Sequence, residues 1–318
     1  MKYAVEVQDL VKRYVKSEVN AVDHISFKVE EGAFFAFLGP NGAGKTTTIS
    51  ILNTTLSKTS GKVQIAGYDL DREQKKIRER IGVIFQNPSL DQNLTAEENI
   101  RLHCSIYGLY PFRPFYRFTP RSYQQKVEEL SSLLGIAQDM FKPIKTFSGG
   151  MKRKLEIIRS LMHEPKVLFL DEPTSGLDPE ARKNLWEYLS QVRRSNKMTM
   201  FLTTHYLEEA EGADTVCVIK KGRVVEYGTP REIKDKLLSS YIIASTHEKE
   251  RLREELTRKQ IPFHATTGDK VRIYYDKTSV QSIIKAINTP LSSITIYNPS
   301  LEEAYLKIIN EDRKEGVA

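Results

Sequence analysis

The run of residues from Gly39 to Thr46 limits the possible folds of this chain more than any other feature. It reads Gly-Pro-Asn-Gly-Ala-Gly-Lys-Thr and follows the continuously apolar segment Phe34 to Leu38, which predicts a buried strand. Glycines let the backbone wrap closely around a phosphate with successive N–H groups pointing inward, and the helix expected over residues 47–52 adds the positive end of its dipole. The spacing is therefore that of a P-loop, a strand-to-helix turn that binds the phosphates of a nucleotide.

Two side chains of this loop have predicted chemical roles. Lys45 meets the β and γ phosphates, and the Thr46 hydroxyl is a ligand for Mg²⁺. The nucleotide-binding residues expected here are Gly39, Pro40, Asn41, Gly42, Ala43, Gly44, Lys45, Thr46 and Thr47.

A second apolar segment, Val167 to Leu170, ends in the neighbouring carboxylates of Asp171 and Glu172. An aspartate at a strand end beside a phosphate loop is placed to hold Mg²⁺ directly or through water, and the next carboxylate to accept the proton of an attacking water. On its own, the pair would favour an acid that caps a helix before Pro173. Together with the P-loop it favours the metal and general-base roles.

The periodicity of the chain predicts an α/β fold with a mainly parallel sheet over about the first 235 residues. A third buried strand is expected over Met198 to Thr203, and a helix over Pro179 to Arg194 with Asp178 as its N-cap. From Tyr241 the order of apolar and helical segments is β-α-β-β-α-β, a ferredoxin-like arrangement, followed by a last helix. We predict two domains, residues 1–238 and 241–318.

Composition and charge describe an ordinary globular chain that is mildly basic. Of its 318 residues 40% are hydrophobic, and 48 Lys and Arg against 41 Asp and Glu give a net charge of +7. Residues 101–160 hold 11 basic and 4 acidic residues and so carry the whole excess, which suggests a basic face. No apolar run approaches the ~18 to 20 residues of a membrane-spanning helix. Cys104 and Cys217 give neither a disulfide framework nor a metal-ligand spacing, so we expect a reducing, cytoplasmic setting.

A third motif lies between the P-loop and the acidic strand end. Ser148, Gly149 and Gly150 stand between Phe147 and Met151, at the start of a helix expected over Met151 to Met162, and make a second anion site. The chain here resembles the nucleotide-binding subunits of ATP-binding cassette (ABC) transporters, whose signature usually reads Leu-Ser-Gly-Gly-Gln. The resemblance covers residues 1–235. It implies a P-loop ATPase domain with an antiparallel N-terminal β subdomain and a helical signature subdomain, the cofactors ATP and Mg²⁺, and ATP hydrolysis.

The resemblance assigns roles to further residues. Gln86 matches the glutamine that senses Mg²⁺ and the γ-phosphate, and His205 matches the switch histidine that contacts the γ-phosphate. With Glu172 and Lys45, His205 completes the expected catalytic set; the expected metal ligands are Thr46, Gln86 and Asp171. Tyr14 falls where an aromatic ring stacks on adenine. Considered alone, Gln86 would more simply be a solvated loop amide, and His205 a structural histidine. Tyr14 would be an ordinary tyrosine of the antiparallel sheet.

The same resemblance implies partners. Ser148, Gly149 and Gly150 of one chain would cap the ATP bound by a second copy or a similar chain, and the pair would power separate membrane-spanning permease subunits at the cytoplasmic face of the cell membrane. Residues 203–210 and 298–306 resemble the multidrug and antibiotic-resistance exporter branch, whose permeases are of the ABC-2 type. The alternative is a soluble ABC ATPase acting on nucleic acid or ribosomes. We expect no nucleic-acid partner, because coiled-coil insertions and a second cassette are absent.

Two segments leave alternatives open. Residues 107–118 contain six aromatic side chains, two prolines and two arginines, which excludes a regular helix and favours either an interfacial loop or a plug for the core of its own subdomain. Lys152, Arg153 and Lys154 predict either attraction of phosphate across the dimer or a solvated helix face.

Overall fold

The computed structural model describes residues 2–15, 17–85, 89–265, 270–275 and 279–310. The chain divides into two compact units, Met1–Tyr227 and Gly228–Ala318. This division precedes the predicted domain boundary at residue 238, because α8 (Pro230–Leu237) packs against α11 (Leu301–Asn310) inside the second unit. That the two units are separate domains stays a prediction.

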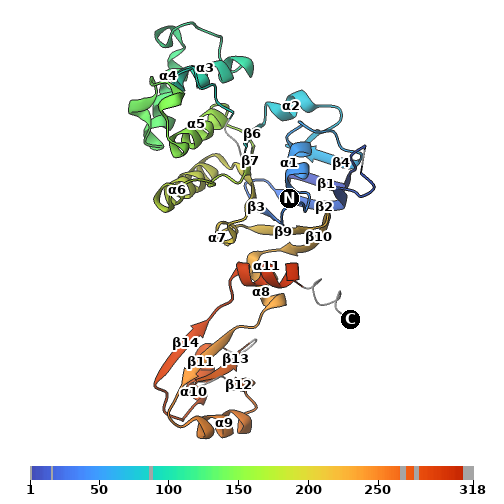
Figure 1. Cartoon of the computed structure of the whole chain (residues 1–318), viewed down its shortest axis with the longest axis vertical. Coiled ribbons are helices and arrows are strands. Elements are labelled where there is room, and N and C mark those ends of the chain that lie inside the picture. Colours follow the sequence, from blue (N-terminus) through green and yellow to red (C-terminus); the bar gives the residue numbers. More distant parts are fainter. Residues whose placement is uncertain (1, 16, 86–88, 266–269, 276–278, 311–318) are drawn as a thin grey trace. The chain divides into compact units, whose positions relative to one another are not determined.

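A six-stranded sheet of order β10-β9-β3-β8-β7-β6 forms the centre of the first unit (Figure 1). β3 runs parallel to β8 and β9, and β7 runs parallel to β6 and β8. Every residue of β3, β7 and β8 is buried, as expected for parallel strands covered on both faces. The strands are β3 (Phe34–Leu38), β6 (Ile81–Ile84), β7 (Val167–Asp171), β8 (Thr199–Thr203), β9 (Thr215–Lys220) and β10 (Arg223–Gly228).

An antiparallel sheet of order β2-β1-β4-β5 packs against this core. Phe27 of β2 joins Phe35 and Phe37 of β3 and Phe201 of β8 in a buried aromatic cluster; the Phe35 and Phe201 ring centroids are 4.9 Å apart. The predicted fold class is confirmed. The strands are β1 (Tyr3–Lys12), β2 (Val22–Glu30), β4 (Ser60–Ile65) and β5 (Tyr68–Asp69).

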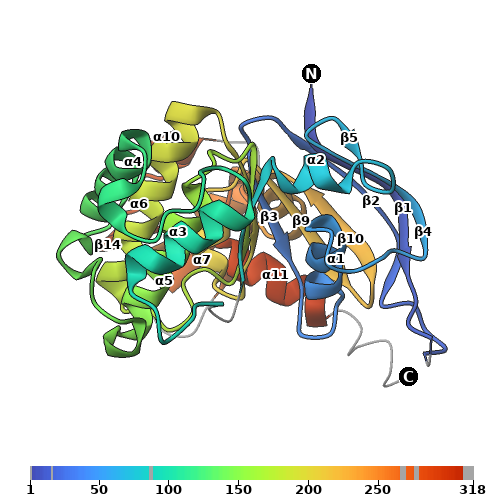
Figure 2. The same ribbon diagram turned by 90° about the horizontal axis from the view of Figure 1, so that it is seen from above.

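The helices of the first unit lie on both sides of the parallel sheet (Figure 2). On the side of the antiparallel sheet lie α1 (Lys45–Leu52) and α2 (Gln74–Arg78). The other side carries α3 (Ala96–Ile106), α4 (Arg121–Leu133), α5 (Gly149–Leu161) and α6 (Pro179–Asn196). The predicted start of α6 is confirmed, because the Asp178 side chain accepts a hydrogen bond from the Ala181 N–H at 2.9 Å and Pro179 opens the helix.

Both cysteines are buried thiols, Cys104 in α3 and Cys217 in β9. Burial raises the pKa of Cys104 to about 12 and also raises the pKa of Cys217. Among the described residues, no helix has the length and apolar character needed to span a bilayer.

The second unit has the predicted ferredoxin-like order of elements. Its antiparallel sheet has the order β12-β13-β11-β14, and the inward residues of β11 and β13, such as Ile242 and Ile273, pack with Leu252, Leu256 and Ile283. The elements are β11 (Tyr241–Ser245), α9 (Lys249–Arg258), β12 (Phe263–Ala265), β13 (Lys270–Tyr274), α10 (Val280–Ala286) and β14 (Ser293–Tyr297).

Candidate nucleotide-binding site

The P-loop joins the carboxyl end of β3 to α1, and two of its glycines are required by close packing. A Cβ on Gly39 would lie 2.4 Å from the Ile219 carbonyl oxygen. Gly44 has a φ of 105°, and a Cβ there would lie 2.5 Å from the Ala21 carbonyl oxygen. No larger residue fits either position without backbone movement, so the sequence pattern has a steric cause.

Lys45 is held inside the loop. Its side chain is buried, and Nζ donates hydrogen bonds to the carbonyl oxygens of Gly39 at 2.6 Å and Pro40 at 3.2 Å. Burial lowers the pKa of Lys45, and the nearby carboxylates of Glu172 and Asp171 oppose that shift. The Lys45 ammonium group is therefore close enough to interact electrostatically with the carboxylates of both predicted acidic residues.

Asp171 ends β7 as a buried carboxylate that accepts a hydrogen bond from the Thr203 hydroxyl at 2.5 Å. Burial raises the pKa of Asp171, whereas the Thr203 hydrogen bond lowers it. The Asp171 carboxylate and the Thr46 hydroxyl are the hard oxygen donors that Mg²⁺ prefers, and Mg²⁺ commonly takes its other ligands from water and substrate phosphates. Their chemistry therefore fits the predicted metal. Gln86, the third predicted ligand, lies outside the described residues.

Glu172 and His205 meet beside Asp171. The Glu172 N–H donates to the Thr203 carbonyl oxygen at 3.0 Å, and Glu172 has a φ of 49°, a left-handed conformation that is rare for a residue with a side chain. Its Oε1 lies 3.3 Å from His205 Nδ1. The Glu172 side chain is 16% exposed and that of His205 is 50% exposed, so solvent reaches the pair.

Tyr14 lies next to the P-loop although it comes from the antiparallel sheet region. Its hydroxyl is 3.3 Å from Thr47 Oγ1, and the residue is 45% exposed. Tyr14 thus lies half-exposed beside the first turn of α1, with the Lys12 ammonium 5.4 Å from its ring centroid, and its stacking on adenine stays a prediction.

The predicted signature residues lie away from this group. Ser148 caps α5, where its hydroxyl accepts a hydrogen bond from the Met151 N–H at 3.2 Å, and Ser148 and Gly149 are exposed. The views in Figures 1 and 2 place α5 and α1 on opposite sides of β3. Within the described ranges, no hydrogen bond or ion pair joins residues 148–150 to the P-loop of the same chain.

Both predictions for the basic residues 152–154 are wrong for Arg153. Its side chain neither lies on a solvated helix face nor is available to attract phosphate across the dimer. It is 4% exposed, its Nε donates to the Pro173 carbonyl oxygen at 2.6 Å, and its Nη2 donates to that of Glu172 at 2.8 Å. Its Nη1 donates to the Phe85 carbonyl oxygen and pairs with the buried Glu156 carboxylate at 3.0 Å. The spacing of Arg153 and Glu156, three residues apart on one helix, was the available signal.

The same helix also holds the segment on the far side of Gln86. Glu156 Oε1 accepts the Ser89 N–H at 3.0 Å, and Arg159 donates to the Ser89 carbonyl oxygen at 2.7 Å. Phe85 and Ser89, the described residues on either side of positions 86–88, are therefore both bound to α5.

Glu209 holds the segment that carries His205, a role that its place in residues 203–210 did not predict. Its carboxylate accepts hydrogen bonds from Thr204 at 2.6 Å, from the Trp186 indole N–H at 3.2 Å and from the Thr174 hydroxyl. These donors come from three different segments of the chain, which only the fold brings together.

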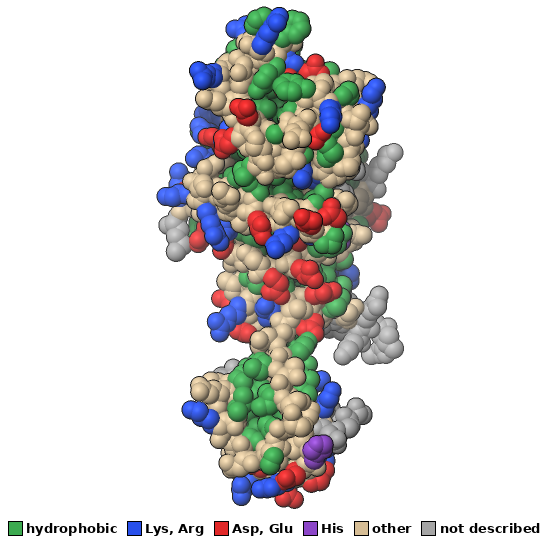
Figure 3. All heavy atoms as spheres, turned by 90° about the vertical axis from the view of Figure 1, so that its left-hand side faces the viewer, with side chains coloured by type: hydrophobic (Ala, Val, Ile, Leu, Met, Phe, Trp, Pro, Cys, Tyr) green, Lys and Arg blue, Asp and Glu red, His purple; other side chains and the backbone are tan. Residues whose placement is uncertain are grey.

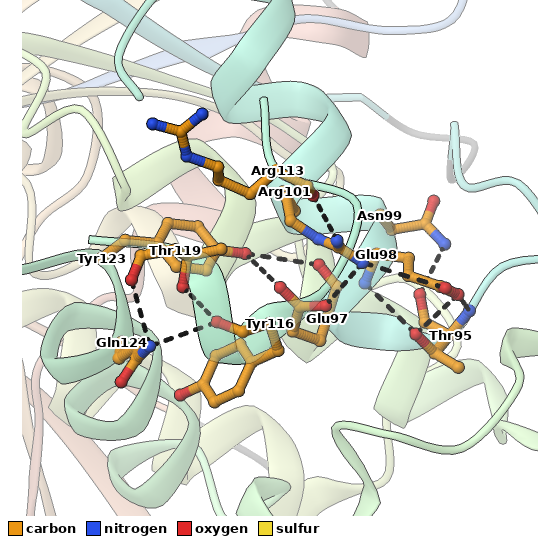
Figure 4. A network of polar contacts seen from close by, with 10 residues as sticks. All are labelled: Thr95, Glu97, Glu98, Asn99, Arg101, Arg113, Tyr116, Thr119, Tyr123 and Gln124. Atoms are coloured by element: carbon orange, nitrogen blue, oxygen red, sulfur yellow. Dashed lines mark hydrogen bonds and ion pairs between the residues drawn. The ribbon is translucent and has the colours of Figure 1, made fainter. Parts of the chain in front are cut away.

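Residues 107–118 divide between the two predicted alternatives (Figure 4). The Arg101 guanidinium, paired with Glu97 at 3.1 Å, donates to the Arg113 carbonyl oxygen, and Gln124 donates to that of Tyr116 at 3.2 Å. Tyr123 lies between these two anchors, donates to Glu97 at 2.9 Å, and contacts the rings of Tyr110 and Tyr116. This part of the segment fills the core of its own subdomain.

The other aromatic side chains of the segment face outward. Phe112, Phe115 and Phe118 are each more than half exposed, and Arg117 lies over the last two rings. Figure 3 shows hydrophobic and basic side chains side by side over the end of the first unit that α3 and α4 form. The outward group keeps the interfacial alternative open.

The basic window of residues 101–160 proves less exposed than its sequence suggests. Arg101, Arg153 and Arg159 are mostly buried and each is paired with a glutamate, so these three cations contribute little to an outer basic face. The expectation that the whole excess lies on one face is corrected accordingly.

A P-loop, an acidic strand end and a histidine at one sheet edge, with a separate serine-glycine signature on a helical subdomain, define an ATP-binding cassette. A family model described as ABC transporter matches residues 22–175. Similar proteins include the daunorubicin resistance ATP-binding protein DrrA3 of Streptomyces coeruleorubidus, 31% identical over 98% of this chain and 97% of that protein. The linearmycin resistance ATP-binding protein LnrL of Bacillus subtilis is 32% identical over 95% and 97%.

A solved structure of an ATP-binding subunit of an ABC transporter matches with a TM-score of 0.65 and 29% identity, over 73% of this chain and 92% of that chain. The chain belongs to the ATP-binding subunits of the ABC transporter family, which are ATP hydrolases. ATP is the nucleotide for the site built above.

Proposed function

We propose that this chain drives export of drugs, lipids or other amphipathic compounds by separate ABC-2-type permease subunits, at the cytoplasmic face of the cell membrane. The names of the resistance proteins that it resembles over nearly their whole length support this function. These relatives are named as resistance proteins, and neither of the two names refers to nucleic acid or ribosomes. The nucleic-acid alternative therefore receives no support.

The observation that carries the proposal is the division of the ATP site into two halves. Lys45, Asp171, Glu172 and His205 lie at one edge of the core sheet, whereas Ser148 is exposed on another subdomain. A second copy, or a similar chain, would bring its signature to this edge and cap the nucleotide. Two ATP molecules would then be enclosed by two chains, and hydrolysis would reopen the pair.

Within one site each residue has a distinct task. Tyr14 stacks on the adenine, and Lys45 with the loop N–H groups holds the phosphates. Thr46 and Asp171, with Gln86, hold Mg²⁺, which supplies charge neutralisation on the phosphate oxygens when bound. Glu172 accepts the proton of the attacking water, and His205 orients the Glu172 carboxylate and contacts the γ-phosphate.

Replacement of Glu172 by Gln tests the catalytic assignment. The variant keeps the shape of the site but loses the base, so ATP turnover should fall by ~10²- to 10⁴-fold while ATP binding is retained. Glu208→Gln is the matched control, because Glu208 is exposed on α7 (Leu207–Ala210), and it should turn over normally. Lys45→Ala should instead weaken nucleotide binding. Near-normal turnover of Glu172→Gln would contradict the assignment.

Purification of the tagged full chain from detergent-solubilised membranes tests the partner. We expect an integral membrane protein to co-purify. Recovery of RNA in a salt-sensitive complex, with no membrane protein, would overturn the transport assignment in favour of the alternative.

A further inference from the structure

A recess of about 670 Å³ lies at the amino edge of the core sheet, the edge opposite the P-loop. Arg80 and Lys166 come directly before β6 and β7, and Lys197 comes two residues before β8. These three strands are parallel neighbours about 4.8 Å apart, so their amino ends meet and bring the three cations together. Residues that are far apart in the sequence thus line one surface.

The backbone beneath the recess is fixed by hydrogen bonds between these strand ends. The Arg80 carbonyl oxygen accepts the Lys166 N–H at 2.7 Å, and the Lys166 carbonyl oxygen accepts the Thr199 N–H at 2.9 Å. The Thr199 hydroxyl then accepts the Gly32 N–H at 2.9 Å. The sheet itself, rather than a loop, sets the positions from which the cationic side chains extend.

Positive charge is strongly in excess in this recess. Among the described residues that line it, Glu31 is the only one with a carboxylate, and it pairs with Lys2 at 3.6 Å; Arg193 pairs with Asp214 at 2.7 Å. Within the part of the chain that the structure describes, no carboxylate lies within 4.0 Å of the other lining cations. These unpaired cations are Arg80, Lys166, Arg194 and Lys197.

The end of α6 explains only part of this cluster. Basic side chains in a last helical turn interact favourably with the helix dipole, which suits Arg193 and Arg194. Arg80 and Lys166 precede strands and have no such role, and like charges gathered in one place repel each other. An anion in the recess would relieve that repulsion.

We propose that this amino-edge recess binds an anionic ligand that bears two or more phosphate groups, separately from the ATP site. Arg80 supplies a planar fork suited to phosphate, and Lys166 and Lys197 supply point charges. The volume exceeds the need of a single phosphate ion, and Ala66 and Tyr68 give the recess an apolar wall. The phosphates can come from a free metabolite or from a lipid headgroup.

The test uses the full chain with its ATP sites saturated by Mg²⁺ and a non-hydrolysable ATP analogue. Binding is measured by calorimetry with inositol hexakisphosphate, and by flotation with vesicles of cardiolipin, whose headgroup bears two phosphates, and phosphatidylcholine against vesicles of phosphatidylcholine alone. The combined variant Arg80→Gln, Lys166→Gln, Lys197→Gln removes three exposed cations of the recess, and its affinity should fall at least tenfold. The combined variant Lys62→Gln, Arg121→Gln, Lys145→Gln removes the same charge at exposed positions elsewhere, and its affinity should be kept.

Each outcome has a meaning. If the recess variant loses affinity for the hexakisphosphate and the control variant does not, the ligand is a free polyphosphate. If the recess variant alone loses binding to the anionic vesicles, the ligand is a lipid headgroup. A pair of charge-preserving changes, Arg80→Lys with Lys166→Arg, should retain most of the vesicle or phosphate binding, and retained ATP binding by the triple recess variant shows that its fold is intact. Equal loss in both triple variants, or no binding of either probe by the parent chain, would overturn the proposal.

Discussion

The Arg153 guanidinium joins the helix after the signature to two strand ends of the candidate site. It contacts the carbonyl oxygens of Phe85 and Glu172 and pairs with Glu156, which is 1% exposed. Burial lowers the pKa of Arg153, and the Glu156 carboxylate opposes that shift. One side chain therefore links the segment before Gln86 to the predicted base.

Arg153→Gln should lower the free energy of unfolding by ~3 to 5 kcal/mol, because it removes the nearer of the two arginines that pair with the buried Glu156 carboxylate and the donor to the carbonyl oxygens of Pro173 and Glu172. Urea unfolding followed by tryptophan fluorescence measures this change. Lys152→Gln, one residue earlier and partly exposed, should change it by no more than ~0.5 kcal/mol. If the two variants changed the free energy of unfolding equally, the contacts of Arg153 would contribute no more to stability than an exposed side chain does.

At the residue scale, the sequence was sufficient where spacing alone defines the chemistry. Gly39, Gly44 and Lys45 belong to one short motif whose spacing is itself the signal, so their role was predictable, although the close approach of Ile219 and Ala21 to the two glycines appears only in the fold. Arg153 and Glu209 act on segments far along the chain, and no count of neighbouring charges could show which cations are buried.

At the scale of elements, α3 packs against α5 and carries His103 into their contact. Burial lowers the pKa of His103 to about 3, and the nearby Arg159 and His163 add repulsion. His103 Nε2 has no hydrogen-bond partner in the described structure, and its ring lies against Tyr107 at 4.3 Å between centroids. The contact between α3 and α5 thus includes a neutral imidazole, that of His103.

The stability of the first unit should therefore fall in mild acid. An unfolded histidine titrates near pH 6.5, so between pH 6.5 and about 3 the unfolded chain binds the additional proton and the free energy of unfolding decreases, by at most ~1.4 kcal/mol per pH unit. His103→Phe keeps the ring contact but cannot titrate, so urea unfolding at pH 6.5 and 4.5 should show a smaller decrease. An identical decrease in parent and variant would contradict this expectation.

The segment between α3 and α4 gives a second prediction at this scale. Its anchors, Arg113 and Tyr116, are bound through backbone oxygens, whereas Phe112, Phe115 and Phe118 are exposed. Changing the three phenylalanines to Ser should leave the melting temperature nearly unchanged but reduce co-purification of the membrane partner. Unchanged co-purification of the membrane partner would contradict the interfacial role. A large fall in melting temperature would show that the three rings belong to the core of the subdomain.

At the scale of the whole molecule, the two units have separate hydrophobic cores, and the single tryptophan of the chain, Trp186, lies in the first. The second core is much smaller, so we expect it to unfold at a lower urea concentration. The transition by far-ultraviolet circular dichroism should begin before the transition by Trp186 fluorescence. ATP at about 100 times its dissociation constant should stabilise only the fluorescence transition, by ~2.7 kcal/mol. Coincident transitions would contradict independent units.

The order of elements in both units was predictable, because strand and helix periodicities are local. The amino-edge recess was not, since the basic residues that precede β6, β7 and β8 become neighbours only when those strands align. Counting charge along the chain directed attention to residues 101–160, three of whose arginines are mostly buried.

The two buried cysteines have a practical consequence for labelling. Because burial raises the pKa of both Cys104 and Cys217, neither thiol presents a reactive thiolate to maleimide reagents near neutral pH. An exposed cysteine introduced on the surface would then be the site of modification without removal of the native pair. A spin label or fluorophore beside the signature helix would report distances between two chains during turnover in an otherwise unaltered molecule.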